Sequence, residues 1–271
     1  MKIAFIGGGN MAAALISGIV KRGTAEPGDL YVIDPSADTR TRLREERGVA
    51  TGETIEATLA AYDAIVLAVE PQVLNDVARA IAPHLGQALV VSIAAGIRAT
   101  DLSRWLGGYT RIVRTMPNMP ALVGMGVTGL AALDAVDAVD RELASVMLGA
   151  VGETVWFDDE ACLDAVTAIS GSGPAYVFYF IEALQEAARQ LGLNEEQGRA
   201  LAVATFTGTA QLAAQSSEPV GVLRKRVTSK SGTTVAALTA FEAQQLKDKI
   251  VSGVLAADAR ARELGDELGR A

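Results

Sequence analysis

The stretch KIAFIGGGNMAAAL, residues 2–15, decides the fold of this chain. Its first residues are apolar enough for a buried strand, three glycines follow, and an alanine-rich run with helical spacing comes next. The pattern Gly7-x-Gly9-x-x-Ala12 is typical of a dinucleotide-binding loop, because the first glycine allows a tight turn, the second lets a pyrophosphate approach the backbone, and the alanine lets the helix pack on the sheet. Phosphates then meet unpaired N–H groups at the start of the helix. We therefore expect a dinucleotide to bind at Gly7, Gly9, Asn10 and Met11.

Outward from this loop, apolar segments of strand length alternate with helical patterns. Strands are expected at 2–6, 30–34, 62–69, 88–96, 109–120 (running into a proline-rich loop), 126–135 and 153–159. The alternation predicts a parallel α/β sheet with right-handed crossovers, a Rossmann-like doubly wound domain at residues 1–160. Residues 161–271 show only helical patterns and predict an all-α domain, with helices at 161–170, 174–192, 194–215, 218–229, 231–242 and 244–265. The charged end of the last helix is expected to fray.

The carboxyl ends of the expected strands carry the other candidate cofactor residues. Asp34 ends the second strand, where an acidic side chain binds the ribose 2′-hydroxyl of NADH, whereas the nearby Ser36 and Arg40 suit the 2′-phosphate of NADPH. Both cofactors therefore stay open. Small residues and a proline loop at the later strand ends leave room for a cofactor, so contacts are also expected from Ala68, Val69, Pro71, Ala94, Ala95, Gly96, Met116, Pro117 and Asn118.

Composition excludes several other classes of function. The 271 residues carry a net charge of −8, so the chain is a poor candidate for nucleic acid. No apolar run reaches the roughly 18 residues of a membrane helix, and the first apolar segment is too short for a secretory signal. One cysteine and one histidine allow neither an intramolecular disulfide nor a usual zinc site, so no metal is expected and a cytoplasmic location fits. Half of the residues are apolar, which suggests surface buried between subunits.

Motifs along the whole chain resemble those of the pyrroline-5-carboxylate reductases. They occur in the order FIGGGNMAAAL, LAVEPQ, SIAAG, RTMPNMP, TAISGSGPAY and LRKRVTSKSGTT. The glycine motifs alone are common, but TAISGSGPAY followed by VTSKSGTT is specific. The resemblance implies reduction of L-1-pyrroline-5-carboxylate to L-proline with NADPH or NADH. It also implies a helical domain that forms a homodimer, often within a decamer, and an active site that includes helical segments of the partner.

The resemblance also assigns the substrate side of the site. It places Thr167 near the chemistry, where its hydroxyl can relay a proton to the imine nitrogen. It places the substrate, a small ring with a carboxylate, against Ser229, Gly232, Thr233 and Thr234. A helix expected to start here supplies an anion site through its free N–H groups, and the Ser229 hydroxyl is expected to cap it.

Some positions depart from the family pattern and leave alternatives open. Glu70 stands where the family usually has lysine, and Lys230 and Ser231 replace proline and glycine. No clear match is found for an asparagine that many members carry near the adenosine ribose. A β-hydroxyacid dehydrogenase is disfavoured because the helix after TAISGSG lacks the lysine of that class. A reductase of a related cyclic imino acid and a non-catalytic NAD(P)H-binding regulator remain as alternatives.

Overall fold

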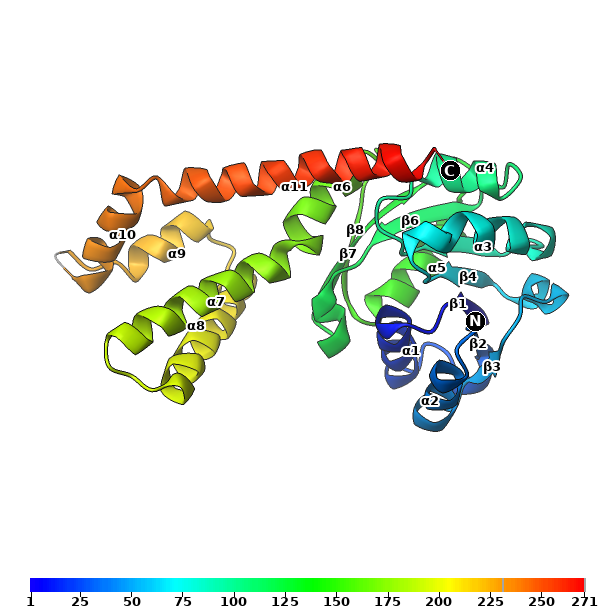
Figure 1. Ribbon diagram of the computed structural model, residues 1–271, viewed down its shortest axis with the longest axis horizontal. Coiled ribbons are helices and arrows are strands. Elements are labelled where there is room, and N and C mark those ends of the chain that lie inside the picture. The colour runs from blue at the N-terminus through cyan, green and yellow to red at the C-terminus, as the bar shows by residue number, and fades with distance from the viewer. Residues whose placement is uncertain (231, 271) are drawn as a thin grey trace. The chain divides into compact units, whose positions relative to one another are not determined.

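The computed structural model describes residues 1–230 and 232–270, which form two compact units (Figure 1). One unit comprises Met1–Ser172 together with the described residues from Ala257 onward, and the other comprises Gly173–Ala256. Residues 161–172, which follow the expected domain boundary, thus belong to the unit that contains the sheet. The domain limits 1–160 and 161–271 stay a prediction.

The first unit is built on one sheet of eight strands. They are β1 (Ile3–Ile6), β2 (Leu30–Ile33), β3 (Ala50–Gly52), β4 (Ala64–Leu67), β5 (Leu89–Ser92), β6 (Ile112–Met116), β7 (Gly126–Ala132) and β8 (Gly152–Trp156), in the order β3-β2-β1-β4-β5-β6-β7-β8. Only the β6–β7 pair is antiparallel. This confirms the doubly wound sheet, whose order reverses between β1 and β4. The edge strand β3 was not expected, because three residues are too few to show a period of two.

Helices cover both faces of the sheet and bury a core on each (Figure 1). Along β1, Ile3 and Phe5 join one cluster while Ala4 and Ile6 join the other, as strand alternation requires. The first cluster includes residues of α1 (Asn10–Lys21), α2 (Ala37–Arg47) and α5 (Ala138–Gly149), and the second includes residues of α3 (Leu74–Ile81) and α4 (Ala99–Trp105). Short 3₁₀ turns lie at Pro27–Asp29, Ala57–Ala61, Pro71–Val73, Ala82–His84 and Met119–Val123.

The segment expected as one helix at 161–170 is divided. It forms α6 (Cys162–Val166) and then a π-helical turn, η6 (Thr167–Gly171). The Ser172 N–H donates to the Thr167 carbonyl at 2.8 Å, a bond that spans five residues. Such turns are rare and occur frequently at functional sites.

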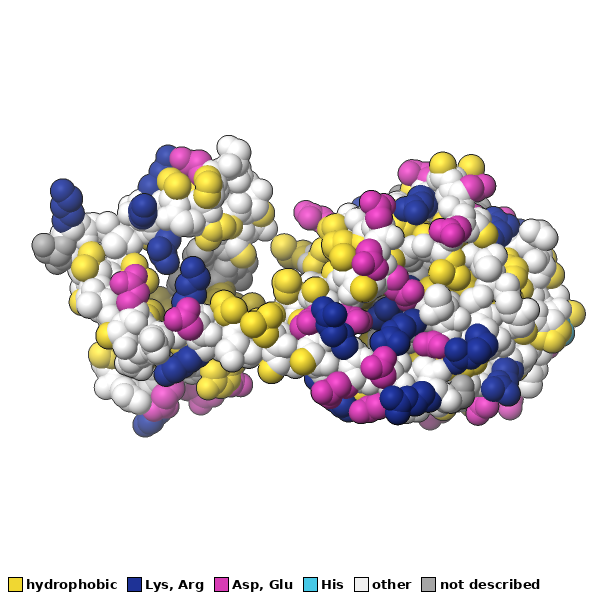
Figure 2. Space-filling model, turned by 90° about the horizontal axis from the view of Figure 1, so that it is seen from above, with side chains coloured by type: hydrophobic (Ala, Val, Ile, Leu, Met, Phe, Trp, Pro, Cys, Tyr) yellow, Lys and Arg dark blue, Asp and Glu magenta, His cyan; other side chains and the backbone are white. Residues whose placement is uncertain are grey.

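The second unit contains only helices among its described residues. They are α7 (Gly173–Gln190), α8 (Glu195–Gln215), α9 (Val220–Arg226), α10 (Thr233–Ala243) and the first part of α11 (Leu246–Leu268). Only Ala188, Gly198 and Ala202 are buried among the described residues of this unit. Figure 2 shows hydrophobic side chains that reach its surface. Helices with so little buried surface have no core of their own and need another surface to cover them.

The last turns of α11 pack on the sheet unit beside α4 (Figure 1). Leu268 contacts the second core cluster, and Asp266 pairs with Arg98 at 2.6 Å. The expectation of a frayed end is therefore wrong, because the end of α11 is held by a core contact and an ion pair. None of the described helices is both long and apolar enough to cross a membrane.

Candidate active site

The glycine loop lies at the point where the strand order reverses. Gly7 follows β1 with φ of 100°, and its N–H donates to the Ile33 carbonyl at 2.8 Å. A Cβ at this position would lie 2.5 Å from the Ala68 carbonyl oxygen, so both conformation and space require glycine. In open α/β sheets this reversal point is where ligands bind.

The start of α1 has the features of a phosphate site. Gly9 is its N-cap, and a Cβ there would meet nothing within 4 Å. Among the described residues no side chain caps this helix, so its first N–H groups face open space beside the exposed Asn10 and the half-buried Met11. Free N–H groups and the helix dipole favour an anion, so these residues fit the phosphates of a dinucleotide.

Asp34 follows β2 and reaches back to the glycine loop. Its carboxylate accepts from the Gly8 N–H and the Ser36 N–H, both at 2.8 Å. Ser36 is the N-cap of α2 and accepts from the Thr39 N–H. The carboxylate is therefore held at the edge of the loop, where a ribose would lie.

Arg40 lies under the same turn and is already engaged. Its guanidinium donates to the carbonyls of Asp34 and Pro35 and to Glu53, at 2.7, 2.9 and 3.0 Å. Arg42, which was not expected from the sequence, donates to the Gly8 carbonyl at 3.2 Å. The only sequence feature that indicates Arg42 is its position on α2, one helical turn after Thr39.

The ends of β4 and β5 supply the next group of expected cofactor residues. Ala68, Val69 and Pro71 follow β4 and are half-buried, and Ala94 is buried whereas Ala95 is exposed. The loop after β5 turns at Gly96, with φ of 78°, against Leu268 of α11. Arg98 next to it pairs with Asp266, and that hydrogen bond raises the pKa of Arg98.

The end of β6 is tied to the π-helical turn. Asn118 is 9% exposed; its amide donates to the Ser170 carbonyl at 3.2 Å, and its Oδ1 accepts from the Val127 N–H at 2.9 Å. Met116 lies against Gly171, where a Cβ would clash with its methyl group, and Pro117 is buried. The structure thus places Met116, Pro117 and Asn118 beside the turn that starts at Thr167.

Thr167 itself is half-buried in this turn. Its hydroxyl donates to the Leu163 carbonyl at 2.8 Å, which fixes the side-chain rotamer and leaves oxygen lone pairs as acceptors. A hydroxyl so held can exchange a proton with a ligand nitrogen without a charged group beside it.

A buried ion-pair cluster next to this turn was missed from the sequence. Arg114 on β6 is 4% exposed and pairs with Glu160 at 3.1 Å and with the buried Asp164 of α6 at 3.2 Å. Glu160 also accepts from the Ala99 N–H at the start of α4. No local pattern reveals this cluster, because Arg114 and Asp164 are 50 positions apart.

The expected substrate residues lie in the helical unit. The N-cap of α10 is Gly232, and among the described residues no side chain caps this helix. The Ser229 cap is therefore wrong: its carbonyl accepts from the Gly232 N–H at 3.1 Å, while its Oγ lies where a Cβ of residue 232 would be. Thr233 is exposed and Thr234 is half-buried at this uncapped helix start. Ser231 lies outside the described residues.

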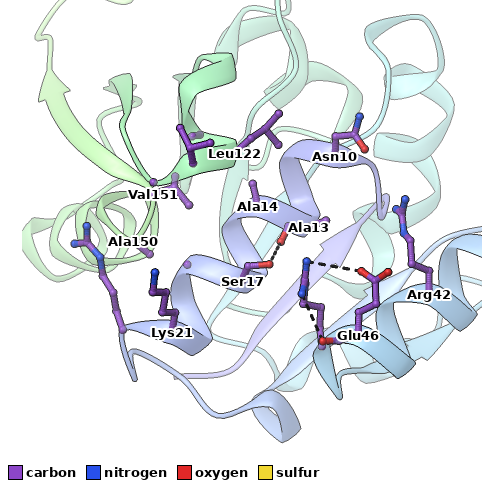
Figure 3. Close-up of a pocket in the computed structure, with 16 residues that line it drawn as sticks. Asn10, Ala13, Ala14, Ser17, Lys21, Arg42, Glu46, Leu122, Ala150 and Val151 are labelled. Carbon is purple, nitrogen blue, oxygen red and sulfur yellow. Dashed lines mark hydrogen bonds and ion pairs between the residues drawn. The ribbon is translucent and has the colours of Figure 1, made fainter. Parts of the chain in front are cut away.

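A cavity of about 780 Å³ runs along α1 (Figure 3). It is lined by Ala13, Ala14 and Ser17 of α1 and faces Arg42 and Glu46 of α2, among others. Of the expected cofactor residues, only Asn10 touches it. The cavity follows the flank of α1 away from the carboxyl ends of the strands, so it is not the dinucleotide crevice. The described residues contain no group of acidic, histidine and cysteine side chains able to hold a metal ion.

Comparisons with known proteins agree along the whole chain. Residues 160–264 match the family model described as pyrroline-5-carboxylate reductase dimerisation, and residues 2–96 match NADP oxidoreductase coenzyme F420-dependent. Pyrroline-5-carboxylate reductase of Pseudomonas aeruginosa is 43% identical over 99% of this chain and 98% of its own, and that of Arabidopsis thaliana is 35% identical over 97% and 95%.

Solved structures give the same result. A pyrroline-5-carboxylate reductase from Coxiella burnetii has a TM-score of 0.92 at 38% identity, covering 97% of this chain and 98% of its own. The pyrroline carboxylate reductase of Plasmodium falciparum, with NADP bound, has a TM-score of 0.87 at 30% identity and covers 98% of both chains.

Proposed function

The chain belongs to the pyrroline-5-carboxylate reductase family, and on that premise we propose that it reduces L-1-pyrroline-5-carboxylate to L-proline with NADPH or NADH. The observation that carries the proposal lies within one unit. The glycine loop occupies the reversal point of the sheet, and the end of β6 in the same sheet is tied through Asn118 to the turn bearing Thr167. A dinucleotide site and a candidate proton relay thus share one scaffold.

The reduced dinucleotide, when bound, supplies the hydride. The N–H groups that follow Gly9 at the start of α1 would hold its phosphates. The other residues expected to contact it are Gly7, Asn10, Met11, Asp34, Ser36, Arg40, Ala68, Val69, Pro71, Ala94, Ala95, Gly96, Met116, Pro117 and the backbone of Asn118. The chain's main contribution is orientation, because a protonated imine is already a strong electrophile.

Thr167 serves the nitrogen end of the reaction. With its own proton donated to the Leu163 carbonyl, the hydroxyl oxygen accepts a hydrogen bond from the protonated imine nitrogen and holds it in place. After hydride transfer has made the nitrogen a neutral amine, rotation of the hydroxyl lets it relay a proton from solvent to that nitrogen. No charged acid is needed, since the iminium carries its proton from solution.

The substrate carboxylate binds at the start of α10. The N–H groups of Thr233 and Thr234 at the start of α10 are donors for it, and the hydroxyls of Ser229 and Thr234 add two more. Gly232, whose own N–H donates to the Ser229 carbonyl, lets the backbone come close to the carboxylate. Each well-made hydrogen bond to the carboxylate contributes about 1.5–3 kcal/mol.

The molecule works as a homo-oligomer. The dimerisation family match and the sparse burial of the helical unit support a homodimer through that unit. The dimers assemble further into a decamer. A cytoplasmic location suits the free thiol of the exposed Cys162.

The test is turnover with both cofactors. Purified protein mixed with pyrroline-5-carboxylate and NADPH or NADH should oxidise the cofactor and yield proline. Thr167→Ala should lower kcat by about 100-fold or more while the Kd of the cofactor stays unchanged. Thr167→Ser, which keeps the hydroxyl, is the matched control and should recover most of the rate. Absence of turnover with either cofactor would refute the proposal.

A further inference from the structure

We infer that Asn118 and Arg114 are positioning residues that hold Thr167 in place, and that the Asn118 side chain acts through this turn and not by contact with the cofactor. The inference rests on the proposed role of Thr167. It rests equally on two sets of side-chain contacts, which we call ties: one involves residues before Thr167 and the other involves residues after it.

The first tie follows Thr167 in the chain. Asn118 is buried, and both ends of its amide are used within the protein, one by the Ser170 carbonyl and one by the Val127 N–H. One N–H and one lone pair of the amide have no partner among these bonds, but with 9% of the residue exposed little of the side chain is open to a ligand. Its effect is instead to pin the middle of η6 to the end of β6 and the start of β7.

The second tie precedes Thr167. Asp164 lies one turn before it on α6 and is paired with Arg114 of β6. Leu163, whose carbonyl accepts the hydrogen bond from the Thr167 hydroxyl, is the residue directly before Asp164. Removing Arg114 would leave the carboxylates of Asp164 and Glu160 without their buried partner, and α6 would lose its anchor to β6.

The two ties belong to one strand. Arg114 and Asn118 flank the end of β6, whose Met116 also packs against Gly171 of the turn. A π-helical turn has poorer backbone geometry than an α-helix and persists only where its surroundings hold it. The strand that ends at the expected nicotinamide site thereby also sets where the Thr167 hydroxyl lies.

The experiment is a double-mutant cycle between Asn118 and Thr167. Asn118→Ala should lower kcat by about 10- to 100-fold, because misplacement of about 1 Å has that cost, and the cofactor Kd should stay within about twofold. In a Thr167→Ala background, Asn118→Ala should lower kcat hardly any further, because the effects of coupled residues are not additive. Arg114→Lys should fall between wild type and Arg114→Met in kcat.

The control uses a comparable ion pair that precedes the same strand. Arg111 pairs with the buried Asp140 of α5 at 2.6 Å, away from η6. Arg111→Met should lower the free energy of unfolding, but its effect on kcat should be the same with Thr167 and with Ala at position 167. Where Asn118→Ala fails to fold, Asn118→Asp keeps the acceptor for Val127 and puts a carboxylate oxygen in place of the donor to Ser170.

Amide hydrogen exchange gives a readout that needs no turnover. Exchange of the Ser172 N–H should quicken in Asn118→Ala and stay unchanged in Arg111→Met. A rise in cofactor Kd that matches the loss of kcat, an equal loss in both backgrounds, or unchanged exchange would each overturn the inference. If wild type shows no turnover, the proposed function fails, and the exchange experiment still decides whether the tie exists.

Discussion

Asp34 carries a carboxylate at the end of β2, where we expect the ribose at which NADH and NADPH differ. Its carboxylate is held by the Gly8 and Ser36 N–H groups, so it cannot swing away from an incoming ribose without losing two hydrogen bonds. Arg40, the cation best placed to offset it, is engaged with two carbonyls and Glu53. A 2′-phosphate would therefore meet a fixed carboxylate, whereas a 2′-hydroxyl could donate to it.

We predict that Asp34→Asn shifts cofactor preference toward NADPH. The change removes one negative charge with almost no change in shape, and the ratio of the Kd for NADPH to the Kd for NADH should fall by about tenfold, or about 1.4 kcal/mol. Titration of both cofactors by nicotinamide fluorescence measures the ratio. Glu45→Gln removes a charge from the exposed face of α2 and should leave it unchanged. An unaltered ratio in Asp34→Asn would show that this carboxylate does not face the ribose.

At the scale of elements, the end of α11 acts as a brace for the loop after β5. Leu268 and Leu264 lie against Gly96, and Asp266 pairs with Arg98. The loop residues Ala94–Gly96 are expected to border the cofactor. A helix whose first half belongs to the other unit thus ends by supporting a loop that is expected to border the cofactor.

Leu268→Ala should weaken both the fold and cofactor binding. Leu268 is partly buried, so the free energy of unfolding should fall by about 1–2 kcal/mol, less than for a fully buried leucine. The loosened loop should also raise the Kd of NAD(P)H, which calorimetry can measure. Glu267→Gln on the same turn removes a carboxylate that is hydrogen-bonded to Arg260, and it serves as the control. A stability loss with unchanged cofactor Kd would mean that the brace is purely structural.

The sequence predicted what depends on neighbours along the chain. The glycine loop, the long strands and five of the six expected helices follow from spacing and were found in place, whereas the helix expected at 161–170 is divided. The brace, the Asn118 tie and the Arg114 cluster could not be predicted, because each joins residues far apart in sequence, up to 168 positions for Arg98 and Asp266. The Ser229 cap was misassigned because the helix begins later than residue 231, at Thr233.

At the scale of the whole molecule, the two units differ in how they are stabilised. The sheet unit has a core on both faces of eight strands, whereas three buried residues serve the described part of the helical unit. Exposed apolar side chains on its helices, such as Leu201, Leu212 and Leu255, need a second surface. Folding of this unit and association of subunits are therefore one equilibrium.

Thermal stability should accordingly depend on protein concentration. Raising the concentration tenfold should raise the Tm, since the associated state alone is stable. Leu212→Glu, at a side chain 66% exposed in the helical unit, should shift sedimentation toward smaller species. Val139→Glu, at a side chain 75% exposed on α5 of the sheet unit, should leave the dimer intact. A concentration-independent Tm with monomeric sedimentation would contradict this expectation.

The sparse core of the helical unit also bears on how the protein is made. During synthesis the strands of the sheet are made first. The helices that follow then expose leucine and valine side chains until a second copy of the chain covers them. The amount of folded protein in a cell should therefore depend on how often newly made chains associate. Chaperones that bind apolar helices should be needed most when the mRNA level is low.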